Sequence, residues 1–272
     1  MQLEKQWTLC SVFGIPVRLN LSVVLLAVYV LYVVFDADAP LLSVLIGGYF
    51  AVVLLLSILL HELAHSVCAI AFGGRVRDIT LQLLGGCAAI ERMPPRPWQE
   101  CLMAAAGPLC SIVLAVAGWG LSIQFGQTVR GWTQQGFFVQ QFVPNLWFEV
   151  VAMLNAGLAC FNLLPAFPMD GGRILRSGCQ IFGKSKVAAT EIAVAVGRAF
   201  AVVWIALAVF DFAFGIGISA PEGLPGCVAY LWNIVLGDGG IFRLLIAYMI
   251  WVSGKRELDY VRLEAEYNGG WR

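Results

Sequence analysis

The chain has 272 residues, of which 60% are hydrophobic and 12% are charged, and its 17 basic and 17 acidic residues cancel. A soluble globular domain carries about 25% charged residues, so this composition excludes an ordinary soluble protein and indicates a polytopic membrane protein. A net charge of zero also excludes the basic footprint typical of nucleic-acid-binding proteins, so we expect no nucleic-acid partner.

Apolar stretches of membrane length recur along the chain, and a span needs about 20 such residues. We therefore expect an all-α polytopic membrane protein with about six transmembrane helices. Five spans with a re-entrant segment would be the alternative, because the last stretch is interrupted by glycines near residue 238. The expected spans are 19–35, 40–72, 101–124, 150–165, 188–218 and a last one that ends near residue 254 and begins between residues 228 and 243.

Basic residues are concentrated in alternate connections between these spans. They precede the first span, follow the second and fourth spans, and follow the last, whereas the opposite connections hold a single basic residue. The positive-inside rule therefore predicts that both termini lie in the cytoplasm. It also places the end of the second span toward the cytoplasmic face.

The two histidines of the chain, His61 and His65, both lie near that end of the second span. Residues four apart lie on one face of a helix, so both imidazoles can reach one metal ion. Glu62 points off that axis and can deprotonate a water on the metal. The alternative is a chance match with buried structural histidines, which is disfavoured because ionisable groups within a membrane span are costly and usually functional.

A catalytic zinc site usually has three protein ligands, so a carboxylate or a cysteine must supply the third. The best candidate is Asp170, which follows a segment that contains Pro165 and Pro168. These prolines cannot continue a helix, so the fourth span must unwind there, and irregular backbone at membrane depth borders protein or a wet cavity. An ordinary interfacial turn is the alternative for Asp170.

Residues 79–90 contain two short apolar runs around a Gly-Gly pair, which predicts a small membrane-associated β-hairpin. Residues 13–20 are a candidate for a further strand. An open edge of this sheet could bind a substrate strand, and the alternative is a plain connecting hairpin. The candidate substrate-binding residues at the turn are Leu83, Leu84, Gly85 and Gly86.

These motifs together resemble the site-2 protease family of intramembrane zinc metalloproteases. The resemblance rests on residues 61–65, on Ala106-Gly107-Pro108-Leu109, and on Asn162-Leu163-Leu164-Pro165 followed by Asp170-Gly171-Gly172. It implies one zinc ion per chain, with His61, His65 and Asp170 as ligands and Glu62 as the catalytic carboxylate. It also implies that Asn162 lies near the scissile bond and stabilises the oxyanion.

The expected organisation is a single membrane-embedded metalloprotease domain over residues 1–272, of the minimal type without PDZ or CBS domains. Its catalytic core covers about 45–175, and its peripheral spans cover about 19–35 and 188–254.

The expected function is intramembrane cleavage in or near transmembrane segments, at the plasma membrane of a prokaryote. By resemblance, the substrates are single-span proteins such as anti-sigma factors, a membrane-tethered sigma-factor precursor or signal-peptide remnants, and a regulatory membrane partner is a further candidate. The main rival is an inert scaffold or chaperone with the same fold. A zinc transporter is less favoured because the polar residues cluster near one end of the spans.

Overall fold

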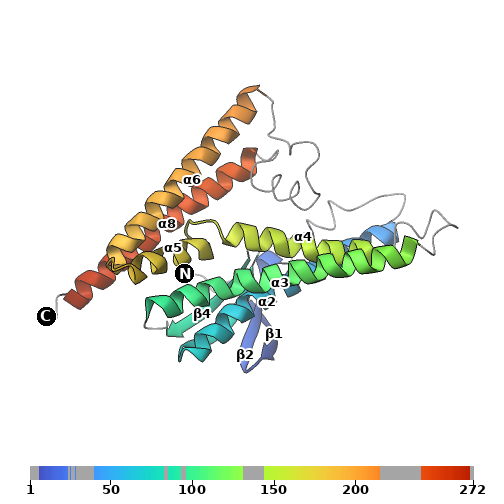
Figure 1. Cartoon of the computed structure of the whole chain (residues 1–272), viewed down its shortest axis with the longest axis horizontal. Helices are drawn as coiled ribbons and strands as arrows, with labels where there is room; N and C mark the ends of the chain where they lie inside the picture. Colours follow the sequence, from blue (N-terminus) through green and yellow to red (C-terminus); the bar gives the residue numbers. More distant parts are fainter. Residues whose placement is uncertain are drawn as a thin grey trace. The chain divides into compact units, whose positions relative to one another are not determined.

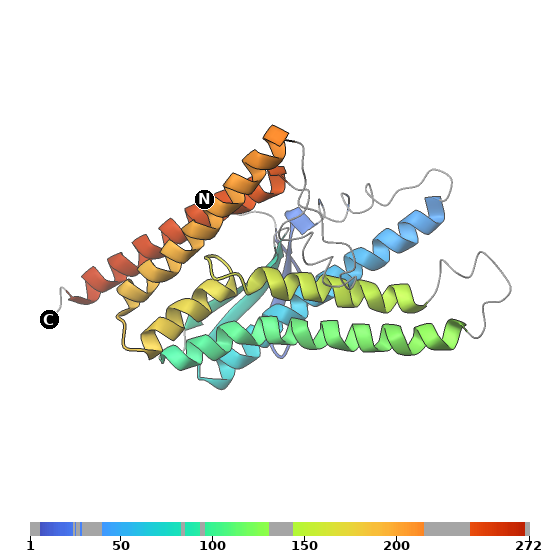
Figure 2. The ribbon, with the colours of Figure 1, turned by 45° about the horizontal axis from the view of Figure 1, so that its top comes forward.

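The computed structural model describes residues 6–23, 25, 28, 40–82, 85–92, 96–130, 144–214 and 240–269. Within these residues the chain is mostly helical, with one small sheet (Figures 1 and 2). It forms two compact units, which we call the first unit (Met1–Met93 with Leu109–Leu158) and the second unit (Pro94–Pro108 with Ala159–Arg272). Helices α3 (Pro97–Arg130) and α4 (Pro144–Asn162) each contribute residues to both units.

The sheet belongs to the first unit and has four strands in the order β1-β2-β3-β4. Strand β2 pairs antiparallel with β1 and parallel with β3, and β3 and β4 form the predicted antiparallel hairpin. The strand expected within residues 13–20 is also confirmed, and β1 is an additional strand that we did not predict. The bounds are Gln6–Val12 for β1, Ile15–Asn20 for β2, Arg75–Gln82 for β3 and Gly85–Arg92 for β4.

One face of this sheet packs on helix α2 (Pro40–Ala71). Val17 of β2 and Ile79 of β3 are fully buried, and both belong to a hydrophobic cluster that includes Ile58 of α2. Side chains alternate between the two faces of a strand, so every second residue reaches the helix. The sheet is thereby held against the helix that carries the histidines.

Among the described residues, three helices are long and apolar enough to cross a membrane, at Val44–Ala71, Pro97–Phe125 and Lys186–Ala213, and Trp147–Asn162 is a shorter apolar helix. They correspond to the second, third, fifth and fourth predicted spans, and the protein is a multi-pass membrane protein. The fourth span ends at Asn162, before the prolines, as expected from the loss of helical hydrogen bonding there.

The first and last predicted spans differ from the structure at their ends. Residues 19 and 20 belong to β2, so the helix cannot begin at residue 19, and most of 19–35 lies outside the described residues. The last helix, α8 (Gly240–Gly269), continues well beyond Gly254. Gly254 is a buried helical residue that faces Val194, so it does not end the helix.

The second unit contains α5 (Asp170–Ile181), α6 (Lys186–Phe214) and α8. Helices α6 and α8 run along each other (Figures 1 and 2). Fully buried small residues such as Ala201 and Ala247 lie on these helices, and small residues let membrane helices approach closely.

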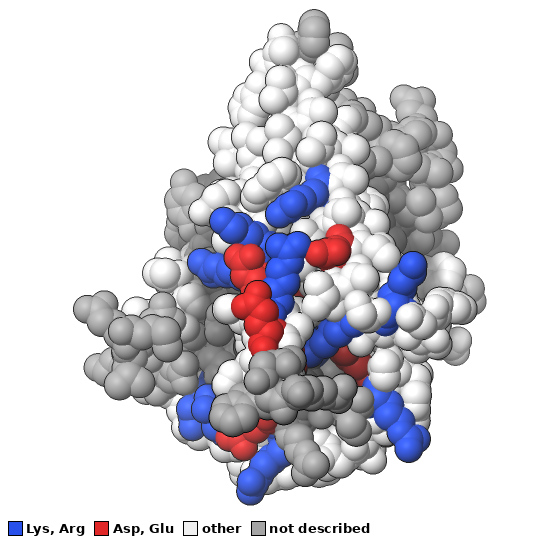
Figure 3. Space-filling view, turned by 90° about the vertical axis from the view of Figure 1, so that its left-hand side faces the viewer, with Lys and Arg blue, Asp and Glu red and all other residues white. Residues whose placement is uncertain are grey.

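Exposed ion pairs join the ends of these helices. Lys186 of α6 pairs with Glu264 of α8 at 2.7 Å, and Arg262 of α8 pairs with Glu191 of α6 at 2.7 Å. Figure 3 shows acidic and basic side chains next to one another on the face that it draws. These exposed pairs contribute little to stability individually, about 0–1 kcal/mol each.

Candidate metal site

His61 and His65 lie on neighbouring turns of α2, as their spacing predicts. Their Nε2 atoms are 3.2 Å apart, and the two rings are nearly perpendicular, at 80°. Both side chains are buried, with 2% and 4% of their surface exposed. The two nitrogens therefore converge on one point inside the first unit.

This arrangement fits a zinc ion. Zn–N bonds of 2.0–2.1 Å at a tetrahedral angle place two nitrogens about 3.4 Å apart, close to the separation of the two Nε2 atoms. Two unprotonated imidazole nitrogens repel each other at that distance unless a cation or a proton lies between them. The donor chemistry of the pair is therefore suitable for the ion.

The other ring nitrogen of His61 has a partner as well. His61 Nδ1 lies 3.0 Å from Oγ of Ser111, a fully buried residue of α3 within the first unit. The sequence pattern does not predict this contact, because 50 positions separate Ser111 from His61 and no local pattern relates them.

Glu62 lies between the histidines in sequence and is half-buried. Its side chain lies against the backbone of Gly86 in β4, where a Cβ atom would come within 2.2 Å of Glu62 Cγ and 3.0 Å of Oε1. The end strand of the sheet therefore passes directly beside the predicted catalytic carboxylate. Only glycine leaves room for this approach without a shift of Glu62.

Asp170 is the first residue of α5 and is buried, with 7% of its surface exposed. A carboxylate at this position is stabilised by the helix dipole. The backbone before Asp170 folds back closely on the start of α5. A Cβ on Gly171 would lie only 2.3 Å from the carbonyl oxygens of Leu163 and Leu164. Glycine is required there, so the Asp-Gly-Gly sequence serves to fold the segment back on itself.

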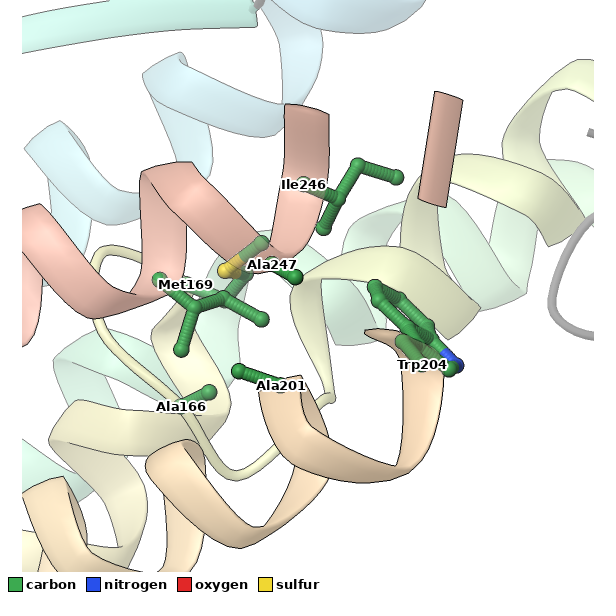
Figure 4. Packing of buried hydrophobic residues seen from close by; sticks show 7 residues of the cluster. Ala166, Met169, Ala201, Trp204, Ile246 and Ala247 are labelled. Carbon is green, nitrogen blue, oxygen red and sulfur yellow. The ribbon is translucent and has the colours of Figure 1, made fainter. Parts of the chain in front are cut away.

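The residue before Asp170 is anchored in the core of the second unit. Figure 4 shows Ala166 and Met169, from the segment between α4 and α5, among Ala201 and Trp204 of α6 and Ala247 of α8. All five are buried. The packing of α6 and α8 thus fixes the backbone from which Asp170 projects.

A buried arginine near the middle of the same short helix holds it from a second position. Arg176 of α5 forms ion pairs with Glu100 of α3 and Glu257 of α8, and its guanidinium lies 5.3 Å from the ring centroid of Phe167. Burial alone would lower the pKa of Arg176, but the two carboxylates raise it above its ordinary value. From the sequence, this residue was expected only to be one of the basic residues of a cytoplasmic connection.

The structure describes three of the five remaining predicted site residues. Asn162 is the half-buried last residue of α4, and its proposed catalytic role stays a prediction. Gly85 and Gly86 begin β4, whereas Leu83 and Leu84 lie outside the described residues.

In the part of the chain that the structure describes, one group of three buried residues offers ligand atoms for a metal ion, and its members are the predicted His61, His65 and Asp170. The histidines belong to the first unit and Asp170 to the second.

Comparison with known structures agrees with this architecture. The chain is similar to the site-2 protease from Methanocaldococcus jannaschii, with a TM-score of 0.54 and 22% identity over 93% of this chain and 95% of that structure. The fold is thus that of a site-2 protease, a multi-pass membrane protein. At the sequence level, Peptidase family M50 matches residues 49–146 and 134–204, which together span more than half of the chain. The chain belongs to this family.

Individual relatives are named zinc metalloproteases or share this region. The Synechocystis sp. protein sll0528 is 36% identical over 84% of this chain and 55% of its own length. Zinc metalloprotease MJ0392 of M. jannaschii is 31% identical over 72% of this chain and 52% of its own length. Stage IV sporulation protein FB of Bacillus subtilis is 32% identical over 45% of this chain and 37% of its own length. The chain thus spans about half the length, or less, of these curated relatives.

Proposed function

We propose that this protein is an intramembrane zinc endopeptidase that hydrolyses peptide bonds in or near the transmembrane segments of membrane-anchored substrates. The observation that carries the proposal is the buried pair of imidazole nitrogens, 3.2 Å apart at one end of a membrane-length helix, with Glu62 next to it in sequence. Membership of Peptidase family M50 supports the same activity.

The proposed ion is one zinc per chain, bound by His61, His65 and Asp170. Two neutral nitrogens and one carboxylate form a common ligand set for catalytic zinc, with a further position open to water or substrate. When bound, zinc would supply Lewis-acid chemistry: it lowers the pKa of water and polarises a carbonyl.

The residues around the ion would carry the proton and the developing charge. Glu62 would take a proton from the attacking water and later give it to the leaving nitrogen. The side-chain amide of Asn162 would donate a hydrogen bond to the oxyanion. These two roles account for a carboxylate that follows His61 directly and for an amide at the end of α4.

Strand β4 would hold the substrate. It is an edge strand of the sheet, with β3 as its neighbour, and its Gly86 contacts Glu62. A substrate helix hides its peptide bonds within its own hydrogen bonds, so it must unwind before cleavage. An unwound segment that paired with β4 would regain backbone hydrogen bonds and pass beside Glu62.

We further propose that the protein acts in a prokaryotic plasma membrane with both termini in the cytoplasm. The basic connections would then lie on the same side as the end of the second span near which the histidines lie. Its substrates would be single-span proteins of the classes named above, and a membrane partner would regulate access.

The test compares membranes that carry the wild type, Glu62→Gln or Glu191→Gln. Glu191 is an exposed residue of α6, so its change is a matched control. We expect Glu62→Gln to retain zinc and to accumulate uncleaved single-span proteins, which quantitative proteomics detects. Normal cleavage by Glu62→Gln would refute the role of Glu62. Purified wild type without zinc would instead favour the inert scaffold.

A further inference from the structure

Ser111 has an environment that a lipid-facing or space-filling serine would not need. Its side chain is fully buried on α3, and its Oγ lies 3.0 Å from Nδ1 of His61. It stands two residues beyond the Ala106–Leu109 segment, which we used only as a family signature. Both residues belong to the first unit.

The position of this contact on the imidazole matters because the ring has two different nitrogens. In a neutral histidine one nitrogen carries the proton and the other has a lone pair, and a partner at one nitrogen selects the state of the other. Nε2 of His61 faces Nε2 of His65 at 3.2 Å, so Nε2 is the nitrogen that would bind the ion. Nδ1 must then carry the proton and needs an acceptor.

We propose that Ser111 is a positioning residue for the metal site, whose Oγ accepts the Nδ1–H of His61 and turns the Nε2 lone pair toward His65. This inference rests on the proposed zinc site and adds a residue to it. The hydroxyl acts through His61 and does not touch the ion. A polar partner on a metal-bound histidine fixes both the tautomer and the ring orientation, and its loss typically weakens metal binding about 10–100-fold.

The geometry also explains why a small residue serves here. The contact joins two transmembrane helices, α2 and α3, that come close enough for a one-carbon side chain to span the gap. A serine hydroxyl can accept from the imidazole because its oxygen carries two lone pairs.

The chain provides a matched control on the same helix. Ser122 of α3 is also buried, at 4% exposure, and its hydroxyl donates to Glu149 at 3.3 Å, within the first unit and away from the histidines in sequence. Ser122→Ala removes the same hydroxyl from the same helix. It reports the general cost of such a deletion.

The experiment measures zinc affinity of the purified full-length chain by competition with a chelator, for wild type, Ser111→Ala, Ser111→Thr and Ser122→Ala. Thermal unfolding of the zinc-free proteins is recorded in parallel. We expect Ser111→Ala to raise the zinc Kd about 10–100-fold. Ser111→Thr, which keeps the hydroxyl, restores affinity, and Ser122→Ala matches the wild type. The zinc-free unfolding temperature of Ser111→Ala should stay near that of Ser122→Ala.

Three results would overturn the inference. Unchanged zinc affinity in Ser111→Ala would leave the proposed enzyme intact and remove Ser111 from it. Equal weakening in the alanine and threonine variants, or weakening that follows a lower zinc-free unfolding temperature, would assign Ser111 to packing alone. A wild type that binds no zinc would remove the proposed function and this inference together.

Discussion

The backbone of Gly86 lies against the side chain of Glu62, so closely that a Cβ at Gly86 would come within 2.2 Å of Glu62 Cγ. Strand β4 and helix α2 therefore meet at the proposed catalytic carboxylate, within one compact unit. This contact relates the strand that would bind substrate to the residue that would move the proton.

The first prediction concerns this contact. Gly86→Ala should displace Glu62 and lower cleavage about 100-fold, the cost of a misplacement near 1 Å. Zinc content should stay at the wild-type level, because the substitution does not touch the histidine ligands. A cleavage assay with a single-span substrate and metal analysis measure both. Gly120→Ala in α3, where a Cβ meets nothing within 4 Å, is the control. Wild-type cleavage by Gly86→Ala would contradict the prediction.

The second prediction concerns Arg176. Arg176→Ala leaves two carboxylates without their buried partner, so we expect the free energy of unfolding to fall by about 3–5 kcal/mol. Lys186→Ala, which removes an exposed ion pair with Glu264, should cost about 0–1 kcal/mol. Denaturant unfolding of the purified proteins measures the difference. Equal, small losses in the two variants would show that the buried pairs of Arg176 do not hold α5.

The raised pKa of Arg176 determines how its contribution to the free energy of unfolding depends on pH. A base with a raised folded-state pKa contributes its full stabilisation below the pKa of the unfolded chain and loses it only as the pH rises through the raised value. The loss caused by Arg176→Ala should therefore not shrink through deprotonation of the arginine between about pH 6 and pH 9. Unfolding at both pH values tests this.

The third prediction concerns a buried polar pair in the membrane. Asn155 of α4 is fully buried, and its Nδ2 donates to Oγ of Ser57 at 2.9 Å, one turn before His61 on α2. A double-mutant cycle of Asn155→Ala and Ser57→Ala should give a coupling free energy of about 0.6 kcal/mol, the average for such bonds between membrane helices. Strictly additive losses would mean that the bond does not stabilise the contact between the two helices.

Features encoded by local patterns could be predicted from the sequence. The spacing of His61 and His65 on one helix face, the end of α4 before Pro165 and the hairpin around Gly86 each depend on neighbouring residues. Their periodicity or backbone chemistry restricts the local structure in almost any fold.

Features that depend on tertiary packing could not be predicted from the sequence. Helix α5 begins at Asp170 although two glycines follow in its first turn. Gly171 is needed there because a Cβ at this position would lie 2.3 Å from two backbone carbonyl oxygens, so no residue with a side chain fits. Ser111 and Arg176 acquire their roles from partners 50 or more positions away. No pattern within a short window of sequence relates such residues, and strand β1 was missed because its pairing partner decides its structure.

The last prediction concerns the third ligand. Asp170→Asn keeps the size of the side chain and removes its charge, so we expect it to abolish stoichiometric zinc binding and cleavage, because an amide is a far poorer zinc ligand than a carboxylate. Asp78→Asn is the control: Asp78 is also a buried acid, but it pairs with Arg18 in the sheet at 3.4 Å. It should lose stability without losing zinc. Metal analysis and unfolding of both variants separate the two effects. Full zinc content in Asp170→Asn would exclude Asp170 as a ligand, and the site would then need another third donor.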